Sequence, residues 1–349
     1  MGAKKPAANG ANQAADAGQN KTADAKGASL FKVSPYMVIP SRVGGFSLYL
    51  KQDDNYVLYA EKGELFTEAH TQRLARLDVE HLYVKAEDYG FYARYVQDNI
   101  QDVLYDEAIP VRERARAWND AAVSLAREAF DRQLPGNVDK RRFRKIQSLI
   151  AKSLKFIARD DALKELARFI SEGGELFRHG IGVMVLTISV LGTYVSEDAD
   201  LMVAVGMGSM LHDIGKLELP PELFHRRPDG LSQEERDMIK SHPALGVGMC
   251  SSLPLPQETL QCILFHHERE DGSGYPSGAM GEMLPSYVRV LALCNEYDEL
   301  TRGMGPGRKP LTPFEALTRI KQCRNAFDPE MFKRLISVLT KADIAKFTA

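Results

Sequence analysis

An adjacent histidine and aspartate, His212 and Asp213, stand at the centre of the segment M-L-H-D-I-G-K at residues 210–216. The apolar, glycine-containing run before them, residues 201–211, predicts a largely buried helix. An ionisable group buried without a partner costs several kcal/mol, so this pair needs something that neutralises it. An imidazole and a carboxylate that can bridge two cations are ligands that suit iron, manganese or zinc. A buried hydrogen bond is the more common explanation of a lone HD dipeptide, so the rest of the chain must decide.

More potential ligands lie at similar intervals on both sides of this pair, in the C-terminal half, which holds six of the eight histidines. Glu175 and His179 are four residues apart and would share one face of a helix. His242 lies in K-S-H-P, and the pair His266–His267 ends an apolar helical segment. These positions are about 25 to 35 residues apart, the separation expected when each ligand lies on its own helix of a metal-binding bundle. The ordered series therefore favours a metal centre over separate hydrogen bonds.

Five segments make the resemblance to a known family specific. They are H-D-I-G-K at 212–216, S-H-P-A-L-G at 241–246, H-H-E-R-E-D-G-S-G-Y-P at 266–276, V-R-V-L-A-L-C-N-E-Y-D-E-L-T at 288–301 and A-F-D-P at 326–329. With these segments, residues 160–345 resemble the HD-GYP domains, a branch of the HD phosphohydrolase superfamily. The resemblance implies an all-helical domain with two or three divalent metal ions, commonly iron or manganese. It also implies hydrolysis of the bacterial messenger cyclic di-GMP to pGpG or GMP.

The resemblance assigns roles to individual residues. Asp213 would bridge two metal ions, and Lys216 would meet a phosphate oxygen, which makes these two the expected catalytic residues. Nucleotide-binding positions would be the loop residues Gly274, Tyr275 and Pro276, and the basic residues Arg308 and Lys309, although the segment at 303–307 departs from the family pattern. The expected metal-binding positions are Glu175, His179, His212, Asp213, His242, His266, His267 and Asn295.

Asn295 is a departure from the family pattern. The family usually has an aspartate ligand three residues before the aspartate of its Y-D-x-L segment, and here that position is Asn295, followed by Asp298. An amide oxygen can bind a metal but brings no negative charge, and Asp298 could replace it only if the helix rotated. Three interpretations therefore remain: a cyclic di-GMP phosphodiesterase, a degenerate domain that binds the nucleotide or a protein without turnover, and a hydrolase of another nucleotide.

The remaining elements predict how the chain is organised. Residues 1–30 carry almost no large apolar side chains and are expected to form a disordered tail. Residues 31–100 predict a small α+β module with a regulatory or interaction role, with a hairpin of strands at 46–50 and 56–59, a helix at 68–77 and a strand at 81–84. A helical connector follows at 101–160, and the metal-binding helical domain occupies 161–345. The expected fold class is therefore mainly α with a small α+β N-terminal module.

The connector carries an apolar seam at Val111, Ala115, Trp118, Ala122, Leu125 and Ala129. A second helix is expected at 141–159, with four apolar residues on one side: Phe143, Ile146, Ile150 and Ile157. These helices either pack on the next domain or form a homodimer, and two short repeats do not choose between them.

The composition limits the partners and the compartment. Of the 349 residues, 44% are hydrophobic and 26% are charged, and the formal net charge is −2. This balance gives no argument for a nucleic-acid polymer or a membrane surface as partner. The four cysteines form no C-x-x-C pair, which favours a reducing cytoplasm.

Overall fold

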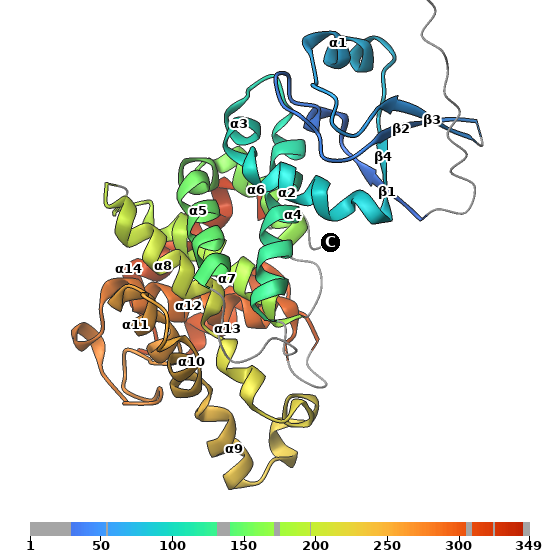
Figure 1. The fold of residues 1–349 in the computed structure, drawn as a ribbon. Helices are drawn as coiled ribbons and strands as arrows, with labels where there is room; N and C mark the ends of the chain where they lie inside the picture. Colours follow the sequence, from blue (N-terminus) through green and yellow to red (C-terminus); the bar gives the residue numbers. More distant parts are fainter. Residues whose placement is uncertain are drawn as a thin grey trace, which may run out of the picture. The chain divides into compact units, whose positions relative to one another are not determined.

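The computed structural model describes residues 29–53, 55–130, 140–170, 175–195, 197–304, 309–323 and 325–344. The chain divides into two compact units, Met1–Tyr92 and Ala93–Ala349 (Figure 1). A mainly helical chain with a small α+β module at its N-terminus confirms the expected fold class. The expected tail at 1–30 lies almost wholly outside the described residues. The division into four segments at 30, 100 and 160 stays a prediction.

The first unit contains a four-stranded antiparallel sheet in the order β1-β4-β2-β3. Its strands are β1 (Leu30–Val33), β2 (Leu48–Gln52), β3 (Asn55–Ala60) and β4 (Leu82–Lys85). The hairpin expected from the sequence is the β2–β3 pair. Helix α1 (Glu68–Arg76) begins with a capping box in which the side chain of His70 accepts from the backbone N–H of Thr67 at 3.0 Å. This histidine therefore has a structural role.

Four helices open the second unit: α3 (Ile100–Tyr105), α4 (Val111–Ala129), α5 (Lys140–Ile157) and α6 (Asp160–Ile170). Before them, α2 (Tyr89–Asp98) crosses the boundary between the units. The expected seam lies on α4, where Ala115, Trp118 and Leu125 are buried. Helix α4 packs against α5, α6 and α7 within the same unit. Packing inside the chain therefore accounts for the seam, and a homodimer stays a prediction.

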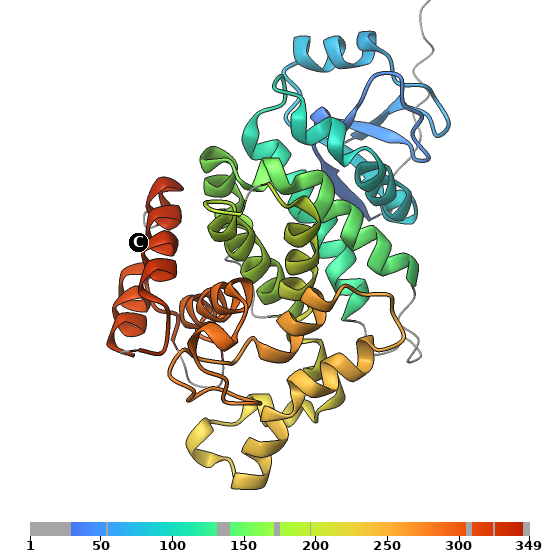
Figure 2. The ribbon, with the colours of Figure 1, turned by 90° about the vertical axis from the view of Figure 1, so that its left-hand side faces the viewer.

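A pair of apolar helices, α7 (Leu176–Leu191) and α8 (Ala199–Leu211), forms the centre of the second unit (Figure 2). Nearly all side chains of both helices are buried, because α7 also packs against α12 and α8 against α5 and α11. The two helices approach closely at Gly180, where a Cβ would collide with the carbonyl of Met210. This close approach brings the first turn of α7 to the end of α8, where His212 lies.

The outer helices of this unit are α9 (Gln233–Lys240), α10 (His242–Cys250), α11 (Gln257–Phe265), α12 (Ser286–Arg302), α13 (Pro313–Gln322) and α14 (Pro329–Lys341). In the described ranges, none of the helices combines the length and the apolar character that a membrane span requires.

Candidate metal centre

Ends of helices deliver most of the candidate ligands. His212 is the C-cap of α8, and Asp213 follows it in the sharp turn to a short 3-10 helix, Ile214–Glu218. His242 is the first residue of α10, and His266 is the C-cap of α11 with His267 after it. The apolar bodies of these helices are held in the core, so the polar residues at their ends are fixed in place.

Two groups of ligand atoms result, and Asp213 belongs to both. One group contains His179, His212 and Asp213, and the other contains Asp213, His242, His266 and His267. Within each group the ligand atoms lie within 4.8 Å of one another. The two oxygens of Asp213 divide between the groups: Oδ1 lies 3.3 Å from Nε2 of His242, and Oδ2 lies 3.6 Å from Nε2 of His212. The carboxylate is therefore placed to bridge two cations.

Hydrogen bonds to the backbone fix the orientation of three imidazoles. The Nδ1 atoms of His212, His242 and His266 lie 2.7–2.8 Å from the carbonyl oxygens of the residues three positions earlier. A carbonyl accepts only, so these contacts assign the proton to Nδ1 and leave a lone pair on Nε2. The Nε2 atoms of His242 and His266 face each other at 3.0 Å. Two facing lone pairs repel unless a cation lies between them, which fits a metal site.

His179 is oriented in the same way by a side chain. Its Nδ1 donates to Oδ2 of Asp298 at 2.7 Å, which leaves the lone pair of Nε2 directed at the first group. That Nε2 lies 3.2 Å from Nε2 of His212 and 2.9 Å from Oδ1 of Asn295. Asp298 also pairs with Arg302. A carboxylate that holds a ligand histidine in one orientation is a usual partner in metal sites.

The protonation states also suit a metal. Burial lowers the pKa of His212 well below its ordinary value and lowers the pKa of His266, so both imidazoles are neutral at pH 7. For Asp213, burial alone would raise the pKa, but Lys216 and the surrounding imidazoles lower it well below the usual range. One oxygen of this buried carboxylate, Oδ1, has no hydrogen-bond donor. Neutral imidazoles around a carboxylate with an unsatisfied oxygen form a donor set that fits divalent cations.

Lys216 is buried close to this carboxylate. Its Nζ donates to Oδ2 of Asp213 at 2.6 Å, and its side chain is largely enclosed. The ammonium group therefore lies beside the carboxylate that both candidate ligand groups share. Its expected contact with phosphate stays a prediction.

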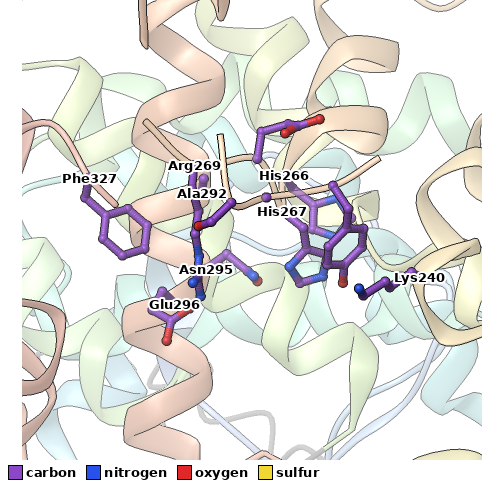
Figure 3. Close-up of a pocket in the computed structure, with 12 residues that line it drawn as sticks. Lys240, His266, His267, Arg269, Ala292, Asn295, Glu296 and Phe327 are labelled. Carbon is purple, nitrogen blue, oxygen red and sulfur yellow. Dashed lines mark hydrogen bonds and ion pairs between the residues drawn. The ribbon is translucent and has the colours of Figure 1, made fainter. Parts of the chain in front are cut away.

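A polar pocket of about 210 Å³ lies against the second group (Figure 3). Tyr275 lines it and stacks on the ring of His267, with the centroids 4.6 Å apart and an interplanar angle of 22°. Gly274 also lines it, and here a Cβ would lie 2.5 Å from the carbonyl oxygen of His267, so only glycine fits. Pro276 follows a cis peptide bond and is not among the lining residues. Two of the three expected loop residues thus shape the pocket.

Three other candidates, Glu175, Arg308 and Lys309, are not part of either ligand group among the described residues. Helix α7 begins at Leu176, with Glu175 as its N-cap in an extended conformation, so the expectation that Glu175 and His179 share a helix face is wrong. Glu175 is exposed and pairs with Arg178 at 3.3 Å. Lys309 is exposed and does not line the pocket, and Arg308 lies outside the described residues. The ligand role of Glu175 and the phosphate contact of the basic pair stay predictions.

Several site residues were not singled out from the sequence. The orienting role of Asp298 required the contact with His179, which is 119 positions away in the chain. Glu268, directly after the histidine pair, is buried and accepts from the backbone and the hydroxyl of Ser277, which ties down the loop that carries Tyr275. The adjacency of Glu268 to the histidine pair was the only signal for it. Four further lining residues, Lys240, Arg269, Glu296 and Phe327, lie within the sequence segments quoted above, but no role was assigned to them from the sequence.

The ends of several helices bring histidines and one shared carboxylate into a buried two-part cluster that is able to hold metal ions, in a helical domain. Residues 185–331 of the chain match the family model described as HD domain. This match, together with the relatives named below, bears out the resemblance to HD-type domains.

Two curated relatives and one solved structure are similar to this chain. The cyclic di-GMP phosphodiesterase PA4108 of Pseudomonas aeruginosa is 29% identical over 51% of this chain and 43% of its own length. The cyclic di-GMP phosphodiesterase response regulator RpfG of Xanthomonas campestris pv. campestris is 33% identical over 38% of this chain and 35% of its own length. The chain thus spans less than half the length of either relative.

The solved structure is Bd1817, an HDG"Y"P protein from Bdellovibrio bacteriovorus. It matches with a TM-score of 0.62 and 20% identity over 89% of this chain and all of that chain. At this identity the likeness shows the fold alone.

Proposed function

We propose that this protein is a metal-dependent phosphodiesterase that hydrolyses cyclic di-GMP to pGpG or GMP. The observation that carries the proposal is the carboxylate of Asp213, shared between two groups of histidines beside an open polar pocket. The two curated relatives, which are named as cyclic di-GMP phosphodiesterases, support the choice of substrate. Bacterial signalling is the process that such an activity would serve.

The two groups would each hold one divalent cation, with Asn295 as an additional oxygen ligand of the group that contains His179. Iron or manganese suits this set of imidazoles and a carboxylate. We propose two cations, because Glu175, the residue expected to help hold a third, lies at an exposed helix start. Cations bound here would supply a water nucleophile near neutral pH and neutralise charge that develops on the phosphate.

The chain's own residues would prepare the site for this chemistry. The backbone carbonyls that fix three Nδ1 atoms hold the ligand nitrogens in place before any substrate arrives. Stacking of Tyr275 on His267 holds the wall of the pocket against the centre. The ammonium of Lys216, hydrogen-bonded to Asp213, is the nearest buried acid to the shared carboxylate and would give its proton to the leaving 3′ oxygen.

One observation favours a second function, a nucleotide receptor without turnover. At Asn295 an amide stands where the family usually has a charged ligand, and a neutral ligand holds a cation less tightly. A domain with this change could bind cyclic di-GMP or a protein partner and signal through occupancy alone.

A cytoplasmic location belongs to the same proposal. The structure records all four cysteines as free thiols, and Cys250, Cys262 and Cys294 are buried. Free thiols are typical of a reducing compartment.

The test uses protein purified without oxygen. Metals per chain are measured by elemental analysis, and cyclic di-GMP turnover on the same sample is followed by chromatography. Two metals per chain with pGpG or GMP as product would support the enzyme. Binding without product, even after iron or manganese is added, would support the receptor. Neither binding nor turnover would contradict both.

A further inference from the structure

The pocket has a wall that the metal centre does not use. Figure 3 shows Phe327, Arg269 and Glu296 on one side of the histidine pair and Lys240 on the other. Arg269 follows the histidine pair in the chain, Glu296 lies on α12, and Phe327 lies in the loop before α14. Three segments far apart in sequence therefore place an aromatic ring, a guanidinium and a carboxylate together.

We infer that this wall is the subsite for one guanine base of the substrate, an inference that rests on the function proposed above. The pocket volume of about 210 Å³ is smaller than the roughly 300–1,000 Å³ of sites that enclose a whole drug-sized ligand. It therefore takes one nucleoside end of a dinucleotide while the phosphodiester faces the histidines.

The polar groups match the hydrogen-bonding edge of guanine. A guanidinium donates to the O6 and N7 acceptors of guanine, as in the commonest specific contact between proteins and that base. A carboxylate accepts from the N1–H and the N2 amino group, which lie beside O6 on the same base. Adenine has an acceptor at N1 and no amino group at C2, so the same carboxylate repels it. Arg269 and Glu296 are neighbours, with Nη2 and Oε2 3.4 Å apart, and the O6 acceptor and N1–H donor that they would bind are adjacent groups of one base.

Arg269 and Glu296 can give up their ion pair and bind a ligand instead, at a small cost in free energy. The side chains of Arg269 and Glu296 are 38% and 27% exposed, and an ion pair of that exposure contributes little to stability. The guanidinium carbon of Arg269 lies over the ring of Phe327, 6.0 Å from its centroid, and both side chains line the pocket.

Phe327 is held in position from both sides. The backbone N–H of Glu270 donates to the carbonyl of Ala326 at 3.0 Å, and Arg289 pairs with Asp328 at 3.4 Å. Asp328 also caps α14 by accepting from the N–H of Glu330 at 2.7 Å. A half-buried ring on a loop fixed in this way provides a stacking surface for a base.

The test compares 5′-GMP with 5′-AMP, which differ only in the base, on the full-length protein with Mn²⁺ by isothermal titration calorimetry. We expect the wild type to bind GMP at least about tenfold more tightly than AMP. Glu296→Gln should reduce this ratio to about threefold or less, since an amide accepts at only one atom. Phe327→Leu, which keeps an apolar side chain, should weaken both nucleotides about tenfold and leave the ratio unchanged.

The matched control is Glu330→Gln, which removes an exposed carboxylate three residues from Phe327 that does not line the pocket. Thermal unfolding of each variant checks the fold. A wild type that binds both nucleotides equally, or a Glu296→Gln variant that keeps the ratio, would overturn the inference.

The two proposals fail separately. Discrimination of GMP from AMP through Glu296, with no product from cyclic di-GMP, would keep the subsite and remove the hydrolysis. Turnover of cyclic di-GMP together with a base preference that does not depend on Glu296 would support the proposed enzyme and contradict the proposed guanine subsite.

Discussion

Asn295→Asp is the substitution that tests the metal centre most directly. The amide oxygen of Asn295 lies 2.9 Å from Nε2 of His179, and its amide nitrogen lies 3.3 Å from a carboxylate oxygen of Glu299. An aspartate at this position would add a negative charge to the group that contains His179, His212 and Asp213. It would also place a negative charge beside Glu299. The substitution should therefore lower the stability of the metal-free protein and raise the stability of the metal-bound protein.

The magnitudes follow from these distances. Two unit charges about 4 Å apart interact by about 4 kcal/mol at an effective dielectric constant of about 20. Without a cation, repulsion from the half-exposed Glu299 is screened, and we expect the free energy of unfolding to fall by about 1–2 kcal/mol. With a divalent cation, the attraction exceeds this repulsion and the cost of burying the carboxylate. We expect metal affinity to rise about tenfold to a hundredfold, or about 1.4–2.8 kcal/mol.

The assay measures thermal unfolding of both proteins with a chelator and with increasing Mn²⁺, and metal content by elemental analysis. Asn295→Asp should unfold at a lower temperature than the wild type under chelation and gain more stability from Mn²⁺. Asn55→Asp, an exposed position in the first unit, controls for the added charge. If Mn²⁺ raised the unfolding temperature of Asn295→Asp and of the wild type equally, Asn295 would not be a metal ligand.

Three further predictions follow from the same centre. Asp213→Ala removes the carboxylate shared by both groups and should abolish metal retention and turnover; a variant that kept metal in elemental analysis and kept activity would contradict the assignment. In metal-free protein, burial lowers the pKa of His212 and His266 in the folded state. As the pH falls past about 6.5, the unfolded chain therefore binds more protons than the folded chain. The free energy of unfolding should then fall by up to about 1.4 kcal/mol per pH unit for each histidine. Thermal unfolding under chelation between about pH 7.5 and about pH 5.5 measures this, and a flat profile would show that these imidazoles are not buried neutral. Gly274→Ala forces a Cβ against the loop backbone and should cost about 1–3 kcal/mol in urea unfolding and lower turnover, whereas Gly248→Ala, where a Cβ meets nothing within 4 Å, should do neither.

The sequence predicted the parts of this structure that depend on local patterns. The apolar run before His212 predicted a largely buried helix, and α8 is buried along most of its length and ends at Leu211, with His212 as its C-cap. The spacing of Phe143, Ile146 and Ile150 predicted the buried face of α5. Each pattern is complete within one segment, so no knowledge of the rest of the chain was needed.

Features that depend on distant contacts were not predictable. Strand β1 falls at the end of the expected tail, because its pairing with β4 joins residues such as Leu30 and Lys85. The helix expected to contain Glu175 begins one residue later, which turns a shared face into a helix cap. Arg269, Glu296 and Phe327 each lie in a segment that carries the family resemblance, but no pattern within one segment predicts that the three side chains meet in one wall.

The position of Asp298 bears on the charge of the metal centre. This carboxylate does not replace Asn295 as a ligand, because it is bonded to Nδ1 of His179, on the opposite edge of the ring from the Nε2 that faces the centre. Burial alone would raise the pKa of Asp298, but the guanidinium of Arg302 and the imidazole of His179 lower it, so it stays ionised. A charge at this distance still reaches the centre through the imidazole, whose Nε2 becomes a better donor to a metal when Nδ1–H is bonded to a carboxylate. With His179 as a ligand, as proposed, Asp298 would partly compensate through this imidazole for the neutral amide at Asn295.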